Sequence, residues 1–372
     1  PLKESVLALG ELELSGRIRP VRGSVAAVYS AKAEGITNIV CDPITAELLK
    51  DIDGIKILTA ESLKEANEKL MDAENFQKTE PKIQFNEVKF TDYEKPSFDL
   101  KGYSKALRAI SVAVAGKLNI LAYAAPGCGK TMLLQGLIPY LTPRLTVEEL
   151  ESVKRLYALA GMEYNTDNAP FRMPHQTASI EGICGGGPNL RPGEISLAHN
   201  GVLFLDEAAE FKTSVLQILR VPLEIKQITL SRAGRSTIFP ANFQLAMATN
   251  PCPCGNYGEK DKICLCSPRA VQLYWKKFSQ PLLDRIQINI HVEKDESETE
   301  SVSLEELREQ VANAYRIQRE VGRFNRDLSL SGDRIKSNIE KVALTIANMD
   351  NRRVAEQCDI DEAEEIANPI YL

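Results

Sequence analysis

The stretch NILAYAAPGCGKTMLLQGL, residues 119–137, decides the fold. Its first apolar residues predict a short buried strand, the segment with two glycines predicts a loop, and the apolar residues after Lys130 predict a helix. Backbone N–H groups in such a loop point inward, and the positive end of the following helix adds to their attraction for phosphate. The order strand, loop, helix therefore predicts a nucleotide-binding α/β domain.

The residue types in this loop suit a triphosphate with its magnesium ion. Lys130 is expected to reach the β- and γ-phosphates, and the Thr131 hydroxyl is expected to hold Mg²⁺. Ala124 stands where the usual pattern begins with glycine, which puts the affinity for ATP in question because alanine resists a positive φ. The alternative is a chance strand–turn–helix with a lysine at its rim. The predicted phosphate-contacting segment is Pro126, Gly127, Cys128, Gly129, Lys130 and Thr131.

A second apolar run, GVLFLDEAAEF at residues 201–211, ends in two acidic residues. It reads as a buried parallel strand, and ligands of open α/β sheets bind at the carboxyl ends of such strands. We expect Asp206 to hold Mg²⁺ and Glu207 to orient and deprotonate the attacking water. An apolar run followed by Asp-Glu is often only a strand that meets solvent, but its place after a phosphate loop favours the catalytic interpretation.

Two later segments offer further catalytic candidates. FQLAMATNP, residues 243–251, predicts a buried strand that places Asn250 near the γ-phosphate, where it could hold the attacking water. PLLDRIQINI, residues 281–290, places Arg285 between a short helix and a strand, from where it could reach the nucleotide of the next subunit as an arginine finger. The simpler alternatives are a strand-end cap for Asn250 and an intrachain salt bridge for Arg285.

Composition limits the classes of protein that remain. The 372 residues carry a net charge of −6, which argues against coating nucleic acid with the whole surface but allows local basic loops. We find no run of about 18 apolar residues and no signal peptide pattern, so we expect no transmembrane helix and a cytoplasmic location. Because the chain opens with Pro1, we also expect it to be a fragment.

The pattern of strands and helices divides the chain into four parts. Residues 1–75 alternate strand and helix signals, with Gly35 closing one helix and Ser62 capping another, and predict a small α/β domain. Residues 76–97 read as a linker, and residues 98–292 as the nucleotide-binding α/β core. Residues 293–372 predict a helical domain that begins with a capping box at Ser303.

Four cysteines lie in NPCPCGNYGEKDKICLCSP, residues 250–268. A cytosolic setting disfavours disulfides, and the Cys-x-x-Cys redox spacing is absent. Two Cys-x-Cys pairs on a polar loop suit a tetrahedral Zn²⁺ site, which would fold a loop with little core of its own. Four free thiols and an iron–sulfur cluster remain as alternatives. The predicted zinc ligands are Cys252, Cys254, Cys264 and Cys266.

Two longer motifs resemble one family. FRMPHQTASIEGICGGGPNLRPGEISLAHNGVLFLDE, residues 171–207, and LSRAGRSTIFPANFQLAMATNPCPCG, residues 230–255, resemble the magnesium-chelatase-like AAA+ ATPases of the YifB/ComM family. The resemblance runs from about residue 5 to 350. It implies an AAA+ P-loop core with a C-terminal helical lid, a hexameric ring with ATP at the subunit interfaces, and DNA helicase action of the branch-migration type on single-stranded or branched DNA.

The same resemblance gives the first domain an identity. Residues 9–36 are similar to the second half of a Lon-protease-like domain, whose preceding half would lie upstream of Pro1. Val25 stands at or next to the position of the catalytic lysine of active Lon, so we expect a structural, non-proteolytic domain. In the lid the family pattern offers Arg334 as the arginine that senses nucleotide. The departures are Ala124, Gln176 in place of a second histidine, and Leu344 at an inner arginine position.

The resemblance also suggests where DNA would bind. Residues 224–243 read as a β-hairpin with glycine at its tip. In related ring helicases the matching hairpin points into the pore, so Arg232, with Arg235 second, is expected to contact DNA phosphates. Gly185, Gly186 and Gly187 predict a mobile loop at the pore. The alternative for both arginines is a solvated hairpin tip.

Two other functions remain open at this stage. One is a protein-remodelling or metal-insertion ATPase, as kinship with magnesium chelatase suggests. The other is a nucleotide-gated scaffold with little turnover, because Ala124 leaves the phosphate loop imperfect.

Overall fold

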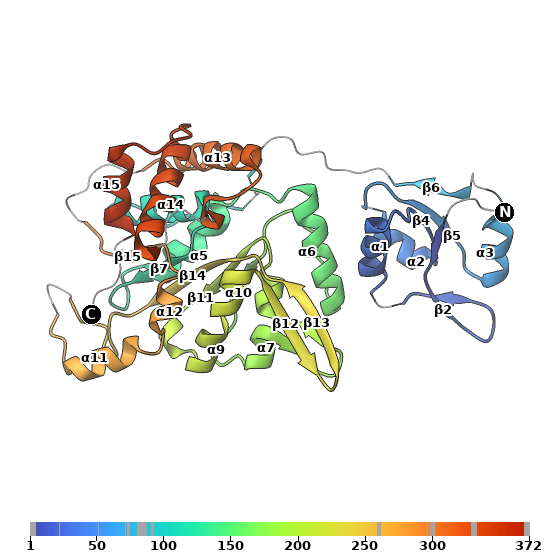
Figure 1. The fold of residues 1–372 in the computed structure, drawn as a ribbon, viewed down its shortest axis with the longest axis horizontal. Coiled ribbons are helices and arrows are strands. Elements are labelled where there is room, and N and C mark those ends of the chain that lie inside the picture. The colour runs from blue at the N-terminus through green and yellow to red at the C-terminus, as the bar shows by residue number, and fades with distance from the viewer. Residues whose placement is uncertain are drawn as a thin grey trace. The chain divides into compact units, whose positions relative to one another are not determined.

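The computed structural model describes residues 5–21, 23–50, 52–70, 72, 75–79, 88–90, 93–258, 262–295, 297, 302–328 and 333–367 (Figure 1). The chain divides into two compact units, residues 1–86 with 145–166, and residues 87–144 with 167–372. Helix α6 (Val147–Ala160), which the sequence analysis placed in the ATPase core, packs in the first unit on α1 (Ser24–Ala33), where Lys32 Nζ lies 3.0 Å from Glu151 Oε1. The four-part division of the chain remains a prediction.

The first unit is a small α/β layer. Its sheet has the order β1-β4-β5-β6, in which β1, β4 and β5 are parallel and β6 is antiparallel. Val28, Ile39 and Leu49 are buried in its core. Besides α1 and α6, its larger elements are β1 (Val6–Ala8), β4 (Asn38–Cys41), α2 (Pro43–Leu49), β5 (Lys56–Thr59), α3 (Leu63–Leu70) and β6 (Gln77–Lys78).

Local signals in this unit were mostly correct. Gly35 follows α1 with a φ of 81°, and the Ser62 hydroxyl accepts a hydrogen bond from Glu65 N at 3.3 Å, as a cap of α3 does. Residues 5–14 do not form one continuous strand. The chain turns at Gly10, and a separate strand β2 (Glu11–Leu12) pairs with β3 (Ile18–Arg19).

The second unit is built on a parallel sheet of five strands in the order β15-β7-β14-β11-β8. Strands β11 and β14 are buried throughout and mostly apolar, as expected for strands covered on both faces. Helices α4 (Ser104–Ala115) and α5 (Lys130–Leu141) contribute most of the core around β7. The strands are β7 (Ile120–Tyr123), β8 (Phe171–Arg172), β11 (Val202–Leu205), β14 (Gln244–Thr249) and β15 (Ile288–His291).

Three C-terminal helices gather beside this sheet (Figure 1): α13 (Leu304–Val321), α14 (Arg334–Met349) and α15 (Gln357–Ile366). The buried Gln318 side chain donates from Nε2 to Ala115 O at 2.8 Å, and the Lys117 ammonium lies 4.0 Å from the centre of the Phe324 ring. These contacts join α13 and the segment after it to the C-terminal end of α4 and the residues that follow it. Across the described ranges, no helix combines the length and apolar character needed to cross a membrane.

Two small hairpins project from this unit. The expected one forms from β12 (Gln227–Arg232) and β13 (Arg235–Pro240), and positive φ values of 47° at Ala233 and 79° at Gly234 give the turn that suits the twist of a tight hairpin. The glycine triplet differs from its prediction as a loop. Its first two residues form β9 (Gly185–Gly186), which pairs with β10 (Arg191–Pro192) between α7 (Ile180–Cys184) and α8 (Glu194–Leu197).

Candidate functional site

The loop after β7 has the backbone of a phosphate cradle. Gly127 and Gly129 adopt φ values of 86° and 82°, and Gly129 is the residue before α5, whose first N–H groups are therefore directed at the loop. Ala124 is fully buried and is not among the residues with positive φ. Alanine therefore fits this position without backbone strain. The reason for expecting weaker ATP binding, a positive φ at Ala124, does not apply.

Lys130 lies inside the loop that it would serve. Its Nζ donates to Ala124 O at 2.7 Å, to Ala125 O at 2.8 Å and to Asn250 Oδ1 at 3.2 Å. The side chain is thus aimed into the cradle and joined to the end of the neighbouring strand β14. Because a phosphate oxygen carries more negative charge than these acceptors, it would attract the ammonium group more strongly.

The pair Thr131 and Asp206 has the geometry of a shared magnesium site. Thr131 Oγ1 donates to Asp206 Oδ1 at 2.8 Å, although the two residues belong to different strand–loop units. Glu207 follows with a φ of 48°, a left-handed conformation that non-glycine residues rarely adopt, and its N–H donates to Asp206 Oδ1 at 3.0 Å. Such backbone strain at the end of a buried strand is typical of functional positions.

Strand β14, which lies between β7 and β11 in the sheet, is followed directly by Asn250. Trp275 Nε1 donates to Pro251 O at 2.9 Å, and the Thr249 hydroxyl lies 2.9 Å from the Tyr274 hydroxyl. Both aromatic residues end helix α11 (Pro268–Trp275), so this helix fixes the segment on either side of Asn250. Burial raises the pKa of Tyr274, so its hydroxyl stays protonated within this hydrogen bond.

These groups together fit Mg²⁺ and a nucleoside triphosphate. The loop amides and Lys130 suit the phosphates, while the Thr131 hydroxyl and the Asp206 carboxylate are hard oxygen ligands that suit magnesium. Bound nucleotide would supply the phosphoryl group at the carboxyl edge of the sheet. There Glu207 could accept a proton from water, and Asn250 could orient that water.

Arg285 and Arg334 do not join this constellation. Arg285 precedes β15, and its carbonyl accepts from Asn119 Nδ2 at 2.7 Å just before β7 begins, so it lies at the amino end of the strand that carries the phosphate loop at its other end. Four residues of strand separate the two ends by about 13 Å. Arg334 NH1 lies 3.5 Å from Asp284 Oδ2 at the same amino edge. Neither arginine therefore contacts the phosphate loop of the same chain.

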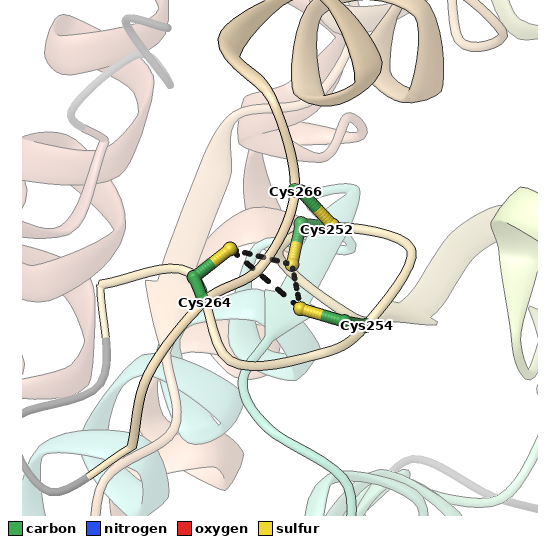
Figure 2. A group of neighbouring side chains, drawn as sticks. All are labelled: Cys252, Cys254, Cys264 and Cys266. Atoms are coloured by element: carbon green, nitrogen blue, oxygen red, sulfur yellow. Dashed lines mark hydrogen bonds between the residues drawn. The ribbon is translucent and has the colours of Figure 1, made fainter.

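The four cysteines converge as a possible metal centre (Figure 2). Cys252 Sγ lies 3.3 Å from Cys254 Sγ and 3.7 Å from Cys264 Sγ, and the latter two lie 3.6 Å apart. All four sulfurs, including that of Cys266, lie within 4.8 Å of one another. A tetrahedral site with Zn–S bonds of about 2.3 Å requires S–S separations of about 3.8 Å, so the quartet fits such an ion.

The protonation of the quartet also favours a cation. Backbone N–H groups, with that of Asn256 first, lower the pKa of Cys254 to about 6. Burial, followed by the neighbouring sulfur atoms, raises the pKa of Cys264 to about 12 and also raises that of Cys266. One thiolate therefore forms readily and opposes ionisation of the others. A divalent cation would remove that opposition, because it stabilises every thiolate at once.

The cysteine loop contacts the phosphate loop at Gly255. A Cβ atom on Gly255 would lie 2.5 Å from Pro126 Cδ, and the φ of Gly255 is 80°. We expect Gly255→Ala to displace Pro126 and weaken ATP binding by about tenfold, a cost of roughly 1–2 kcal/mol for backbone strain and overpacking. Titration with a fluorescent ATP analogue measures the change.

Gly258→Ala is the matched control for this prediction. Gly258 has a φ of 83° in the same loop, but its added Cβ would meet nothing within 4 Å. The two variants share the backbone strain and differ in the contact with Pro126. Equal ATP affinities for the two variants would contradict the coupling of the loops.

The hairpin arginines lie at an exposed tip beside the glycine strands. The Arg232 side chain is 54% exposed, and its NH1 lies 3.8 Å from Glu181 Oε1, the atom that accepts from Gly187 N at 2.8 Å. Arg235 is paired with Arg232 across the turn and is exposed. The two segments predicted to approach DNA are therefore neighbours, linked through Glu181.

Sequence reasoning missed two arginines in these regions. Arg191 is exposed on β10, and Arg220 is half-buried at the start of α10 (Arg220–Ile225), close to Glu224. Arg191 lies within the family-like stretch of residues 171–207 but is not singled out there, and Arg220 stands outside both quoted motifs. Of the histidines, His199 is buried and accepts from Asn242 N at 3.0 Å, while exposed His175 bonds to Thr177.

The parallel sheet, the phosphate loop after β7, the acidic pair after β11 and the polar end of β14 between them define an ATPase of the AAA+ class. Residues 97–300 match the family model described as magnesium chelatase, subunit ChlI, and the chain belongs to this family.

Relatives with curated sequences show the same kinship. The chain is 38% identical over 293 residues to the competence protein ComM of Haemophilus influenzae, covering 76% of this chain and 56% of that protein. It is 34% identical over 288 residues to the protein YifB of Escherichia coli, covering 76% and 55%, and 36% identical over 296 residues to an uncharacterized protein of Mycobacterium tuberculosis, covering 78% and 58%. The chain thus spans a little over half the length of these relatives and resembles ComM and YifB within the family.

Proposed function

We propose that this chain hydrolyses ATP as one subunit of a ring-shaped motor that acts on DNA. The observation that carries the proposal is the meeting of Lys130, Thr131, Asp206 and Asn250 at one edge of the sheet, with hydrogen bonds of 2.8 Å and 3.2 Å that join three strand ends. Lys130 binds phosphate, Thr131 and Asp206 hold the metal ion, and Asn250 orients water. Glu207 accepts the proton of that water.

The DNA part of the proposal is supported by the two adjacent hairpins. Arg232 and Arg235 place two positive charges at an exposed tip of a chain whose net charge is −6. Repeated around a hexameric ring, these tips would make a basic lining that binds phosphates without reading base sequence. The name of the relative ComM refers to competence, which is in keeping with DNA as a partner.

The proposal is tested by binding and turnover with single-stranded and branched DNA. We expect both DNAs to bind at low salt and to raise the ATPase rate. The double variant Arg232→Ala/Arg235→Ala should bind DNA more weakly and should reduce the slope of log affinity against log salt by about 1 for each phosphate contact removed. Filter binding at several salt concentrations measures both quantities.

Arg353→Ala is the control for loss of an arginine. The Arg353 side chain is 69% exposed and pairs with Glu320 in the helical region, away from the hairpins in sequence. It should leave the salt slope unchanged. A chain that hydrolyses ATP but neither binds nor responds to DNA at low salt would contradict the DNA proposal and leave protein remodelling or metal insertion as the motor's task.

We also propose that the cysteine quartet holds Zn²⁺. Elemental analysis of the purified chain should give about one zinc per chain, and Cys264→Ser should lose it. Cys358→Ser is the control, because Cys358 is an exposed free thiol outside the quartet. Replacement by Co²⁺ should give the thiolate absorption bands of a tetrahedral site in the parent chain and in Cys358→Ser, but not in Cys264→Ser. Iron and labile sulfide in place of zinc, or no metal, would overturn this assignment.

A further inference from the structure

A cluster of three arginines lies away from the chain's own phosphate loop. Arg285 NH2 pairs with Glu224 Oε2, and Arg334 NH1 lies 3.5 Å from Asp284 Oδ2. Arg220 stands one turn before Glu224 on α10, and its charge, like those of Arg285 and Arg334, lowers the pKa of the Glu224 carboxyl. We call Arg220, Arg285 and Arg334 the arginine cluster. Its two carboxylates, Glu224 and Asp284, leave one positive charge in excess.

Arg220 is the member whose environment is incomplete. Its Nε is buried and has no hydrogen-bond partner in the described part of the chain, and no ion pair is formed by its guanidinium there. A buried N–H group without an acceptor destabilises a fold, so such groups usually have a function or a partner from elsewhere. The Arg220 side chain as a whole is half-buried, so an anion from outside the described chain would meet its exposed part and not the buried Nε.

The place of the cluster decides which anion fits. Arg285 is tied through its carbonyl to Asn119 at the amino edge of the sheet, the edge opposite to the phosphate loop. The ATP of the same chain therefore lies out of reach. The Arg285 side chain is 15% exposed and that of Arg334 is 57% exposed, so the cluster extends from a partly buried position to the surface. A compact group of guanidinium forks suits a terminal phosphate presented by a docked surface.

We propose that Arg220 contacts the phosphates of ATP bound to a second copy of this chain, beside Arg285 and Arg334. The inference rests on the proposed function, because it requires a ring in which each phosphate loop faces the arginine cluster of its neighbour. It adds a catalytic residue to the hydrolysis reaction. Glu224 pairs with Arg285 and follows Arg220 by one turn of α10.

Kinetics of Arg220→Ala give the first test. We expect a fall of about 10²-fold in the ATPase rate at saturating ATP, as when one donor to a transition-state charge is removed. The dilute chain should bind a fluorescent ATP analogue as the parent does. The thermal unfolding temperature should stay the same or rise, because the substitution deletes an unsatisfied buried donor. A structural role would instead lower the unfolding temperature together with the rate.

Two further variants sharpen this test. Arg220→Lys keeps the charge but loses the fork, so it should recover part of the rate. Arg316→Ala removes an exposed arginine whose only described bond is to Asn313 and should change nothing. A parent-like rate for Arg220→Ala overturns the inference. Loss of DNA binding with an unchanged DNA-free rate also overturns it and assigns Arg220 to DNA.

Mixing of variants tests the contribution from a second copy. Arg220→Ala chains have an intact phosphate loop, and Lys130→Ala chains have an intact arginine cluster. Each variant alone should be nearly inactive, whereas mixed rings should regain ATPase activity at interfaces where Lys130 meets Arg220. No gain on mixing, in material that co-assembles, overturns the inference. If the parent chain itself hydrolyses no ATP in any assembly, the proposed function fails first, and the two failures are thus distinguished.

Discussion

The Arg285→Ala chain is expected to hydrolyse ATP about 10³- to 10⁵-fold more slowly than the parent, the effect of removing an arginine finger. Its affinity for ATP should be unchanged, because Arg285 lies at the amino edge of the sheet and does not touch its own phosphate loop. Phosphate release at saturating ATP measures the rate, and titration of the dilute chain with a fluorescent ATP analogue measures the affinity.

Glu224→Gln separates this role from a simple salt bridge. Arg285 pairs with Glu224 in the unassembled chain, and the Arg285 guanidinium holds the pKa of that carboxyl below its usual range. If the pair only stabilised the fold, Glu224→Gln and Arg285→Ala would lower the unfolding temperature and the rate alike. The finger instead predicts that Glu224→Gln retains most of the activity. Similar loss of activity in both variants would disprove the finger.

Replacing Glu207 by glutamine is expected to lower ATP turnover by about 10²–10⁴-fold, the contribution of a general base. ATP should still bind, because Lys130, Thr131 and Asp206 remain and the glutamine preserves the shape of the side chain. Single-turnover hydrolysis of bound ATP, followed by quenching, measures the chemical step. The expected product is a chain that retains intact ATP.

Glu210→Gln is the matched control. Glu210 is exposed and ends the short 3-10 helix Ala208–Glu210 that directly follows Glu207. This variant should turn over ATP at the parent rate. Equal rates in the Glu207→Gln and parent chains would show that Glu207 is no base, and a uniformly negligible rate would favour a nucleotide-gated scaffold with little turnover.

The phosphate loop, the acidic pair and the arginine hairpin could be predicted because each is a local pattern. A buried strand, a turn residue and a helix start are encoded within about twenty residues, and parallel strands bring their carboxyl ends to one edge. The meeting of Thr131 with Asp206 follows from that rule alone. The four sulfur atoms also converge as the cysteine spacing suggested.

The features that sequence reasoning missed depend on long-range packing. Helix α6 carries an ordinary capping box at Thr146, and nothing in its pattern shows that it packs on α1. Strand β8 has only two residues and is recognisable only through its pairing with β11. Arg220 and Glu224 are one helical turn apart, but Glu224 pairs with Arg285, which is 61 positions away, and no spacing in the sequence reveals that pair.

Asn119 gives strand β7 an unusual mechanical position. Its side chain donates to Arg285 O at 2.7 Å and accepts from Leu245 N at 2.8 Å, so one amide anchors the arginine segment to the centre of the sheet. The phosphate loop follows the other end of the same four-residue strand, β7. In a closed ring, strand β7 would connect the arginine that acts on a neighbouring subunit's ATP to the loop that binds the chain's own ATP. This connection would favour ATP hydrolysis in order around the ring.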